Sequence, residues 1–457
     1  MGKSFSLRTE EEPETPKRPA TPGWIWVLIV SVPLLLSAIV VALAVWLTTT
    51  TAPQPPQSGT TLAERRRVTQ PEAPPPPPDP TPAPRTCALA PNHGVLVSGT
   101  DRARRPSVAL SADRVGVGFV RFTQASQSCQ RLEASFIELP TPLPAALPPE
   151  TLPVVFDEGN GCTGVILHTP TVALVGTQPW AFTCRFPVSR GLECQIRRSA
   201  SDIGTWGLPQ TRDMPGNTVV AAASAGNRLW VAQPADARGI VVVTGSTAAG
   251  QRPDTPSFAV EGSRTDAATL DAVSETEAWL AWRDGGSVGV VRLGRDGRPV
   301  GAARRVASLS GRPTEPALVA SASGAVLLFG DATADGTGAL MVAQVPVEGD
   351  PTTPVALVPS LAGTTIARPR ATLDAAGRII TVWTERAGER GTVRGAVFRG
   401  DDLLPVIAPF AVSAPTSDAG DADVAPGLTP LRGAVAWEER TLQGTWGVRV
   451  ARLLCAE

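Results

Sequence analysis

Apolar residues are distributed along this chain in three ways, and each distribution predicts a different kind of structure. The stretch from Trp24 to Leu47 holds 24 residues without one charge. From Cys87 onward the apolar residues come in short runs bounded by glycine, proline and polar residues, which is typical of β-strands. Residues 1–23 and 48–86 show no apolar periodicity. The pattern therefore predicts one membrane helix, an all-β body and two segments without a core.

The continuous apolar run is long enough to span a membrane. As a helix, its 24 residues would extend for about 36 Å, and a bilayer core is about 30 Å thick. Trp24, Trp26 and Trp46 lie near its ends, where tryptophan favours the membrane interface. The alternative is a cleaved signal peptide, because Ala42–Ala44 has the form of a cleavage site. Signal peptides usually carry only about 7 to 15 apolar residues, so we predict a single transmembrane helix over 24–47.

Basic residues near the ends of the span predict its orientation. Cytoplasmic flanks of membrane helices are enriched in lysine and arginine. No basic residue follows the span until Arg65, whereas four precede it: Lys3, Arg8, Lys17 and Arg18. We therefore predict a single-pass cell-membrane protein with a cytoplasmic N-terminus and a periplasmic or extracellular body.

The two segments without apolar periodicity differ in composition. Residues 1–23 mix acids and bases with few apolar residues, which predicts a disordered cytoplasmic tail, with a docking peptide as the alternative. The segment 48–86 contains twelve prolines, which favours polyproline II structure and a semi-rigid linker. Its PPPPP run could alternatively bind an aromatic groove. The predicted ectodomain is 87–457.

The body contains an internal repeat. Four stretches begin with a turn, continue into an apolar run that ends in an aromatic residue, and pass through a polar turn into a second valine-rich run. Their aromatic anchors follow one another at intervals of 47, 54 and 54 residues: Trp282, Phe329, Trp383 and Trp437. Such a period is typical of a propeller, and the repetition predicts that these aromatic side chains pack in the core.

A proline opens the apolar run that precedes most anchors. The prolines are Pro316, Pro369 and Pro426, and Pro106 has the same relation to Phe119. Two further units fit near Val175 and Trp230, which makes about seven units of about 50 residues. A unit of three or four strands cannot bury its own faces, so the units must pack on one another as blades. The predicted fold class is all-β, a β-propeller of about seven blades.

Because it contains this repeat, the body resembles exported or membrane-anchored bacterial β-propeller repeat proteins of uncharacterised function. It lacks the G-H and W-D pairing of WD40 repeats, and it contains no tyrosine, which is usual in kelch repeats. The resemblance therefore implies an architecture and no functional residue. Six or eight blades, or a pair of β-sandwiches, are the structural alternatives.

The cysteines predict how the ring closes. All six lie beyond the span, in a segment that we place in an oxidising compartment. The last unit, 424–455, shows only three strands, and the segment 87–99 has no blade of its own, so we place this segment as the missing fourth strand. Antiparallel pairing then brings the two ends of the body together. The predicted disulfides are Cys87–Cys455, Cys184–Cys194 and Cys129–Cys162.

The sequence shows no catalytic, cofactor-binding or metal-binding motif. There is no G-x-S-x-G, and the two histidines, His93 in a loop and His168 on an apparent strand, have no partners in a motif. Two acidic segments do not match a calcium-binding loop, so we predict that they are solvated turns. They contain Asp331 and Asp335, and Asp418, Asp421 and Asp423. Gly285 and Gly286 are expected in a hairpin turn.

Two classes of function are compatible with these features. The formal net charge of −1, with acids and bases interspersed, excludes a nucleic-acid footprint. We favour a binding or scaffolding module that holds an envelope protein or glycan. The alternative is an envelope glycan hydrolase or lyase with its site at the propeller axis. A carboxylate-lined central pocket would favour the enzyme, and an apolar or arginine-rimmed face the binding module.

Overall fold

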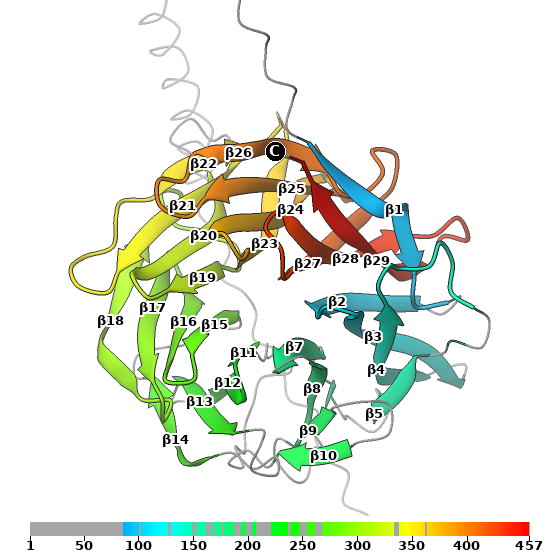
Figure 1. The fold of residues 1–457 in the computed structure, drawn as a ribbon, viewed down its shortest axis with the longest axis horizontal. Coiled ribbons are helices and arrows are strands. Elements are labelled where there is room, and N and C mark those ends of the chain that lie inside the picture. Colours follow the sequence, from blue (N-terminus) through cyan, green and yellow to red (C-terminus); the bar gives the residue numbers. More distant parts are fainter. Residues whose placement is uncertain are drawn as a thin grey trace, which may run out of the picture. The chain divides into compact units, whose positions relative to one another are not determined.

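Short valine- and alanine-rich runs pair into antiparallel sheets that stand around a common axis, as a β-propeller (Figure 1). The computed structural model describes residues 86–456, except 100–101, 127–128, 149–150, 152, 161–165, 168–169, 176–177, 187–192, 198–202, 207–220, 236–238, 247–253, 261–266, 333–337 and 362. The predicted tail, membrane span and linker up to residue 85 lie outside these residues. Within the described part of the chain, no helix could cross a membrane.

Six of the sheets have four strands and are regular blades. In five of them, strands that follow one another in the sequence also pair in space. The sheets are β2 (Arg102–Leu110), β3 (Arg114–Ser126), β4 (Cys129–Pro140) and β5 (Val154–Asn160); β11 (Ala221–Ala225), β12 (Arg228–Ala235), β13 (Gly239–Ser246) and β14 (Asp254–Val260); β15 (Ala268–Ser274), β16 (Glu277–Asp284), β17 (Ser287–Gly294) and β18 (Pro299–Ala307); β19 (Ala317–Ser321), β20 (Gly324–Ala332), β21 (Gly338–Pro346) and β22 (Val355–Pro359); and β23 (Thr365–Leu373), β24 (Arg378–Ala387), β25 (Arg390–Arg399) and β26 (Pro405–Ala411).

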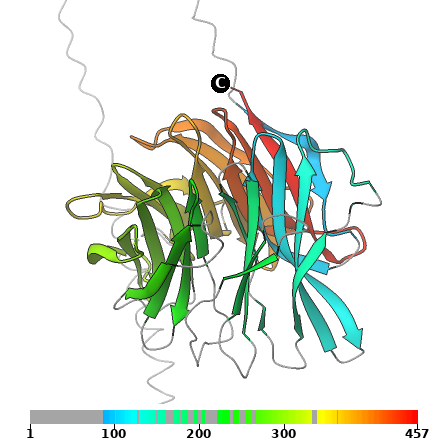
Figure 2. The same ribbon diagram turned by 60° about the horizontal axis from the view of Figure 1, so that its bottom comes forward.

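The sixth regular blade joins the two ends of the body. Its order is β1 (Cys87–Leu96), β29 (Trp446–Cys455), β28 (Arg432–Arg440) and β27 (Ala419–Pro426). β1 runs antiparallel to β29, and Cys87 lies directly opposite Cys455. The predicted closure of the last blade by the segment that begins at Cys87 is therefore confirmed (Figures 1 and 2).

The prediction of about seven blades is corrected to six, because the stretch between β5 and β11 departs from the four-stranded pattern. This stretch forms a five-stranded sheet of shorter strands. β6 (Ile166–Leu167) and β7 (Thr171–Val175) both pair with β8 (Gln178–Phe186), and β9 (Glu193–Arg197) and β10 (Ile203–Trp206) follow on the other side. Proline has no N–H for a sheet ladder, and Pro170 lies between β6 and β7, where a regular blade has one continuous strand.

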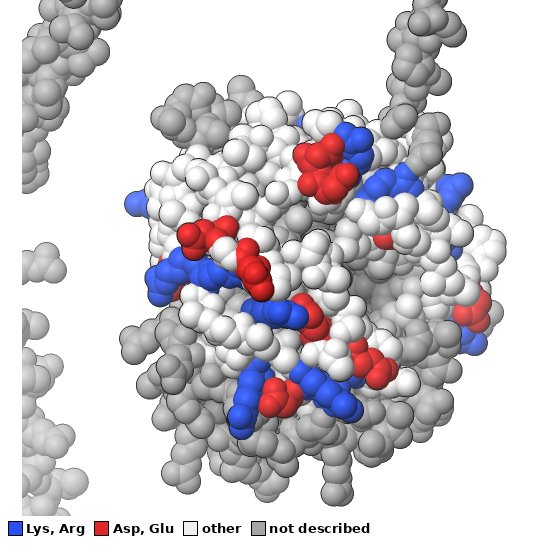
Figure 3. Space-filling view, turned by 60° about the vertical axis from the view of Figure 1, so that its left-hand side comes forward, with Lys and Arg blue, Asp and Glu red and all other residues white. Residues whose placement is uncertain are grey.

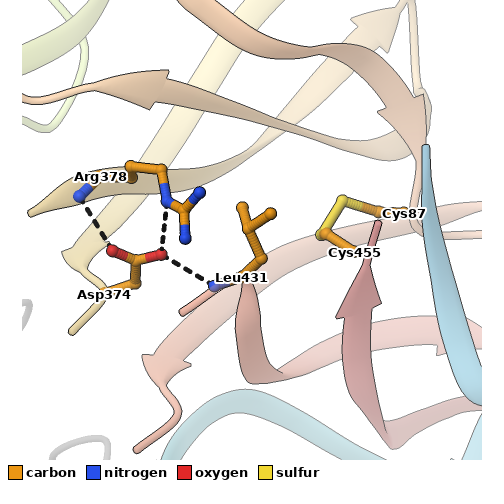
Figure 4. Close-up of a disulfide and its surroundings, with 5 residues drawn as sticks. All are labelled: Cys87, Asp374, Arg378, Leu431 and Cys455. Atoms are coloured by element: carbon orange, nitrogen blue, oxygen red, sulfur yellow. Dashed lines mark hydrogen bonds and ion pairs between the residues drawn. A yellow bond between two sulfur atoms is a disulfide. The ribbon is translucent and has the colours of Figure 1, made fainter. Parts of the chain in front are cut away.

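A disulfide joins Cys87 to Cys455, with a Cα–Cα distance of 4.0 Å (Figure 4). Nearby, Asp374 links the turn between β23 and β24 to the turn between β27 and β28 by hydrogen bonds. Its carboxylate accepts hydrogen bonds from the peptide N–H of Leu431 at 2.8 Å and from both the peptide N–H and the Nε of Arg378 at 2.9 Å. The last two blades are thus held together beside the closure.

The aromatic anchors all lie on the second strand of a regular blade. None of them is more than 2% exposed, so the prediction of core packing is confirmed. They are Phe119, Trp230, Trp282, Phe329, Trp383 and Trp437. Packing against them leaves little room: Gly289 lies opposite Trp282, and a Cβ at this glycine would be 2.3 Å from the indole ring. The expected hairpin turn at Gly285 and Gly286 is also present, with a φ of 58° at Gly285.

Two predictions about the last blade are corrected. Its first strand begins at Ala419, not at Val424, and Pro426 ends this strand instead of opening it. As a result Asp421 and Asp423 belong to a strand and not to a solvated turn.

The prediction that Asp331 lies in a solvated turn is also corrected. Its carboxylate accepts hydrogen bonds from the segment that precedes β19, including the hydroxyl of Ser308 at 2.7 Å and the N–H of Leu309 at 2.8 Å. Asp335 lies outside the described residues.

Candidate functional site: a charged axial cavity

A cavity of about 900 Å³ lies on the propeller axis. It is lined by the innermost strands β2, β7, β11, β15, β19, β23 and β27 and by the residues just before some of them. The volume is in the range of small-ligand sites. Most of the lining is alanine, serine, threonine, valine or leucine, and the charged lining residues are Arg105, Asp271, Glu315, Arg368, Arg370, Asp421 and Asp423.

Several innermost strands carry the same irregularity beside this cavity. In β2 the register shifts between Arg104 and Ser107. The two residues between them, Arg105 and Pro106, lie opposite the single Phe119. This is a β-bulge, in which one extra residue is inserted into one strand of a pair, and bulges are common where a site needs a side chain to be re-aimed.

The two-against-one arrangement recurs at three further anchors. At each, the first of the two residues is charged and lines the cavity, and the second is buried. Glu315 and Pro316 lie opposite Phe329, Arg368 and Pro369 opposite Trp383, and Asp421 and Ala422 opposite Trp437. The repeat therefore presents a charged side chain to the axis in four blades, always at the position facing the buried aromatic ring.

Three of these charged residues have a left-handed backbone. The φ angles are 58° for Arg105, 47° for Arg368 and 41° for Asp421. A positive φ is uncommon for residues other than glycine and has an energetic cost, and such residues cluster at functional sites. The structure thus maintains a strained backbone where it presents charge to the cavity.

Ion pairs connect the charged residues of neighbouring blades. Arg368 of β23 forms a close ion pair with Asp421 of β27. The Nε of Arg368 is also 3.8 Å from a carboxylate oxygen of Glu315, and a terminal nitrogen of Arg370 is 3.9 Å from the same oxygen. Glu315, the two arginines and Asp421 therefore form a continuous charged wall across three blades.

A buried glutamate lies beneath this wall. The side chain of Glu438, on β28, is only 1% exposed. It accepts a hydrogen bond from the Nε of Arg104 at 2.9 Å and another from the peptide N–H of Arg105 at 2.5 Å. Burial, and then repulsion from Asp421, raises the pKa of Glu438 to about 7, against the opposing effect of Arg104. This carboxyl group is thus partly protonated at neutral pH.

Polar side chains also tie the innermost strands to one another. Asp423 of β27 accepts a hydrogen bond from the N–H of Val108 in β2 at 2.9 Å, and burial raises its pKa. Asp271 of β15 similarly accepts from the N–H of Ala320 in β19 at 2.8 Å, and burial raises its pKa to about 6. These bonds satisfy peptide groups that no neighbouring strand reaches. Asp423 and Asp271 therefore have structural roles.

The charges that a ligand could reach are mainly positive. Arg105 is exposed, and within the described residues its guanidinium has no partner. The side chains of Arg368 and Arg370 are 36% and 35% exposed, whereas that of Glu315 is 24% exposed and that of Asp421 only 7%. One carboxylate oxygen of Asp421, Oδ1, is buried and accepts no hydrogen bond from the described part of the chain.

The other predicted site residues lie elsewhere or stay predictions. His93 is exposed in β1, with a φ of 69°, and His168 lies outside the described residues. Cys184 and Cys194 lie directly opposite each other in the backbone pairing of β8 and β9, a register compatible with the predicted bond. Cys129 begins β4, and Cys162 lies outside the described residues, so this pair stays a prediction. Among the described residues, no three His, Cys, Asp or Glu side chains gather as metal ligands.

The sequence contained a signal for the cavity that the search for motifs missed. A charged residue directly precedes the proline in three of the repeats, as Arg105-Pro106, Glu315-Pro316 and Arg368-Pro369. These prolines open apolar runs, and the charge directly before each of them is the signal. In the fourth case alanine replaces proline after Asp421, so the signal is weaker there.

The carboxyl groups and the arginines around the cavity differ in how they are engaged. A glycosidase needs two carboxyl groups that both reach the substrate. Here Glu438 is buried under two hydrogen bonds, and Asp421 is engaged by Arg368. The reachable arginines, by contrast, have the planar donor geometry that recognises carboxylate groups.

Comparisons with known proteins add little to this geometry. No family model and no curated protein matches the chain. Similar solved structures include a protein of unknown function from Dyadobacter fermentans (12% identity, 81% of this chain and 98% of that one, TM-score 0.43) and a prolyl endopeptidase (12% identity, 78% and 47%, TM-score 0.43). Another is an α-L-arabinanase from Penicillium chrysogenum (11% identity, 50% and 79%, TM-score 0.36). None of these similarities assigns a function to this chain.

Proposed function

We propose that this chain is a membrane-anchored, extracytoplasmic binding module whose axial cavity holds part of an envelope partner. In this proposal the helix over 24–47 anchors the protein, and the linker over 48–86 holds the propeller away from the bilayer. The observation that carries the proposal is how the charged side chains of the cavity are paired and exposed. Its acids are engaged by arginines or peptide N–H groups, while arginine side chains remain within reach of a ligand.

The described residues on the face seen in Figure 3 show no comparable concentration of one charge. On the face seen in Figure 3, basic and acidic side chains lie next to one another. Several of the exposed arginines are paired with a carboxylate of the same blade, as Arg305 is with Asp284 at 2.7 Å. Charges paired in this way contribute little to recognition. The cavity is therefore the better candidate for a specific site.

Blocking the cavity tests this function. Ala222 lies on β11 in the cavity lining and is partly exposed, so Ala222→Trp should fill space without removing a core contact. Ala302→Trp, at an exposed position of the outer strand β18, is the matched control. In non-ionic detergent, with cell-envelope fragments freed of lipid so that the proposed membrane helix cannot insert, we expect the full chain to co-sediment with the fragments, the cavity variant to lose most of this binding, and the control to keep it. Equal binding by both variants would contradict the proposal.

The alternative function is an envelope glycan hydrolase or lyase at the axis. The observation in its favour is Glu438, because a carboxyl group with a pKa of about 7 beside a carboxylate is suited to general acid catalysis. Incubation of the full chain with envelope glycans, followed by measurement of new reducing ends, separates the two functions. We expect no release of sugars. Release that is abolished by Glu438→Gln would establish the enzyme.

The predicted topology has its own test. A reporter that works only outside the cytoplasm, fused after Glu457, should be active, and one that works only inside should be silent. Activity of the cytoplasmic reporter would reverse the orientation.

A further inference from the structure

The axial cavity has two chemically different walls. The innermost strands β23, β27 and β2, with Glu315 before β19, contribute the charged wall. The strands β7, β11 and β15 contribute a wall of small and apolar residues, in which the only charged residue is Asp271, and this aspartate is engaged by peptide N–H groups. A ligand that filled the cavity would meet charge on one side and small apolar groups on the other.

We infer that the cavity binds an acidic peptide segment, with its carboxylates against the arginines of the charged wall and small side chains against the opposite wall. This inference rests on the proposed binding function and names its ligand class.

Charge complementarity supports the carboxylate. Arg105 has no partner within the described residues, and Arg368 and Arg370 are each more than a third exposed. The contacts of Arg370 are incomplete, because its ion pair with Glu315 is long, at 3.9 Å. A ligand carboxylate could therefore add hydrogen bonds to these arginines, and charge-assisted bonds of this kind are among the strong ones.

The buried oxygen of Asp421 supports a ligand that also carries N–H groups. Asp421 lines the cavity, and its Oδ1 is buried and accepts no hydrogen bond from the described residues. A buried acceptor without a donor destabilises the protein, so a donor supplied by the ligand would be favoured. Peptide N–H groups provide such donors at regular intervals along an extended chain.

The composition of the apolar wall disfavours a sugar with the same acidic groups. None of the described residues that line the cavity is aromatic, so these residues offer no flat surface for the apolar face of a sugar ring. The hydroxyl groups around the ring would meet alanine, valine and leucine, and burying them there without hydrogen bonds has an energetic cost. Alanine-sized side chains of a peptide have no such groups to satisfy.

Isothermal titration of the full chain, in non-ionic detergent, with three probes tests the ligand class. The probes are the peptide Asp-Ala-Asp-Ala-Asp-Ala with an acetylated N-terminus and an amidated C-terminus, its asparagine counterpart with the same blocked ends, and a trimer of galacturonic acid, which carries the same number of carboxylates on sugar rings. We expect binding of the acidic peptide, weakened by added salt, and no binding of the asparagine peptide. Binding of the galacturonate trimer without the acidic peptide would overturn the peptide class while leaving the binding function intact.

Arginine variants show where the peptide binds. Arg105→Gln removes a cavity charge that has no ion-pair partner in the described structure, so folding should be unaffected. It should weaken binding of the acidic peptide by about tenfold or more. Arg298→Gln removes an exposed arginine outside the cavity lining, in the turn between β17 and β18, and should not change binding. Equal effects of the two variants would overturn the inferred site.

The outcomes also separate the two proposals. If none of the probes binds but Ala222→Trp still abolishes co-sedimentation with envelope fragments, the peptide inference is wrong and the binding function stands. If Ala222→Trp has no effect on co-sedimentation and no probe binds, the binding function is wrong as well.

Discussion

The two sides of the ring are built from the same repeat but differ by one residue per innermost strand. In the blades of β11 and β15 the anchors face single residues, Trp230 opposite Ala223 and Trp282 opposite Ala268. In the blades of β19, β23, β27 and β2 the anchor faces two residues, the first of them charged. We call the first pair the plain blades and the second group the bulged blades.

The comparison shows how a repeat protein can build a site without a dedicated loop. The buried aromatic ring fixes the position of the innermost strand. The hydrogen-bond ladder therefore cannot accommodate an extra residue opposite the ring, and this residue bulges out of it. In the bulged blades that residue is presented to the cavity. The difference between an apolar and a charged wall therefore comes from an insertion at one place in the repeat.

The two sides also differ in how the chain connects them. The plain blades follow one another along the chain, whereas the bulged blades include the closure between β1 and β29. Their cohesion depends on contacts between residues far apart in sequence, such as Arg104 with Glu438 and Cys87 with Cys455. Three changes test whether the bulged side is held together in this way, and a fourth provides a comparison on the plain side.

Removing the closing disulfide should have the largest effect. The bond joins residues separated by 368 positions, and loop-closure entropy predicts that Cys87→Ala with Cys455→Ala lowers the free energy of unfolding by about 4 kcal/mol. Urea denaturation measures this loss. The same double change at Cys184 and Cys194, a predicted local pair, should cost less because its loop is short. Equal losses would show that closure of the ring is not what the bond stabilises.

Arg104→Ala should have the next largest effect. It removes the side-chain partner of Glu438, which is only 1% exposed, and an unpaired buried charge is strongly destabilising. We expect a loss of about 2 to 3 kcal/mol at pH 8, and less at pH 6, where the carboxyl group can be protonated. Arg105→Ala is the matched control, because the adjacent guanidinium has no partner in the described residues; it should change stability by less than about 0.5 kcal/mol.

Glu438 should make the bulged side less stable as pH rises. In the folded chain its pKa is about 7, against a usual value of 4.5. Between these values the folded state holds a proton that the unfolded state has lost, so stability is greatest below pH 4.5 and declines as pH rises through 7. We expect a loss of about 2 kcal/mol between pH 5 and 8 in the parent protein.

Glu438→Gln tests this effect, because glutamine keeps the size of the side chain and an acceptor for the N–H of Arg105 but does not titrate. The variant should lose only the part of the stability that Asp271 contributes below about pH 6.5, and its denaturation midpoints should be nearly constant above that pH. A variant that loses stability as steeply as the parent would assign the pH dependence to another group.

Asp271 should show the same behaviour on the plain side, with a smaller effect in a more acidic range. Its pKa is raised to about 6 from a usual value of 3.8, so its contribution to stability is lost as pH rises from 3.8 through 6. Asp271→Asn should flatten the stability profile below pH 6.5 by about 1 kcal/mol and leave the range above it unchanged. If this variant also removed the change between pH 6.5 and 8, the two groups would not titrate independently.

Much of the fold could be predicted because it depends on local pattern. The anchors Trp282 and Trp383 are buried in their blades wherever the ring places them, since an aromatic side chain in an apolar strand has to pack inside. The pairing of Cys87 with Cys455 followed from counting strands in the last unit. The start of β27 was misplaced because Asp421 and Asp423 give it the composition of a turn.

The sequence by itself determined the repeat, the aromatic core, the closure of the ring and the alternation of strands and turns, because each depends on residues close in the chain or on a count of units. The tertiary structure alone decided the cavity. Glu315, Arg368, Asp421 and Arg105 belong to four different repeats, and they line one cavity because the blades surround an axis. Burial within that ring raises the pKa of Glu438, and the arginine side chains are the charged groups that stay most exposed to a ligand. This burial arises only when the blades are assembled, so no single repeat contains it.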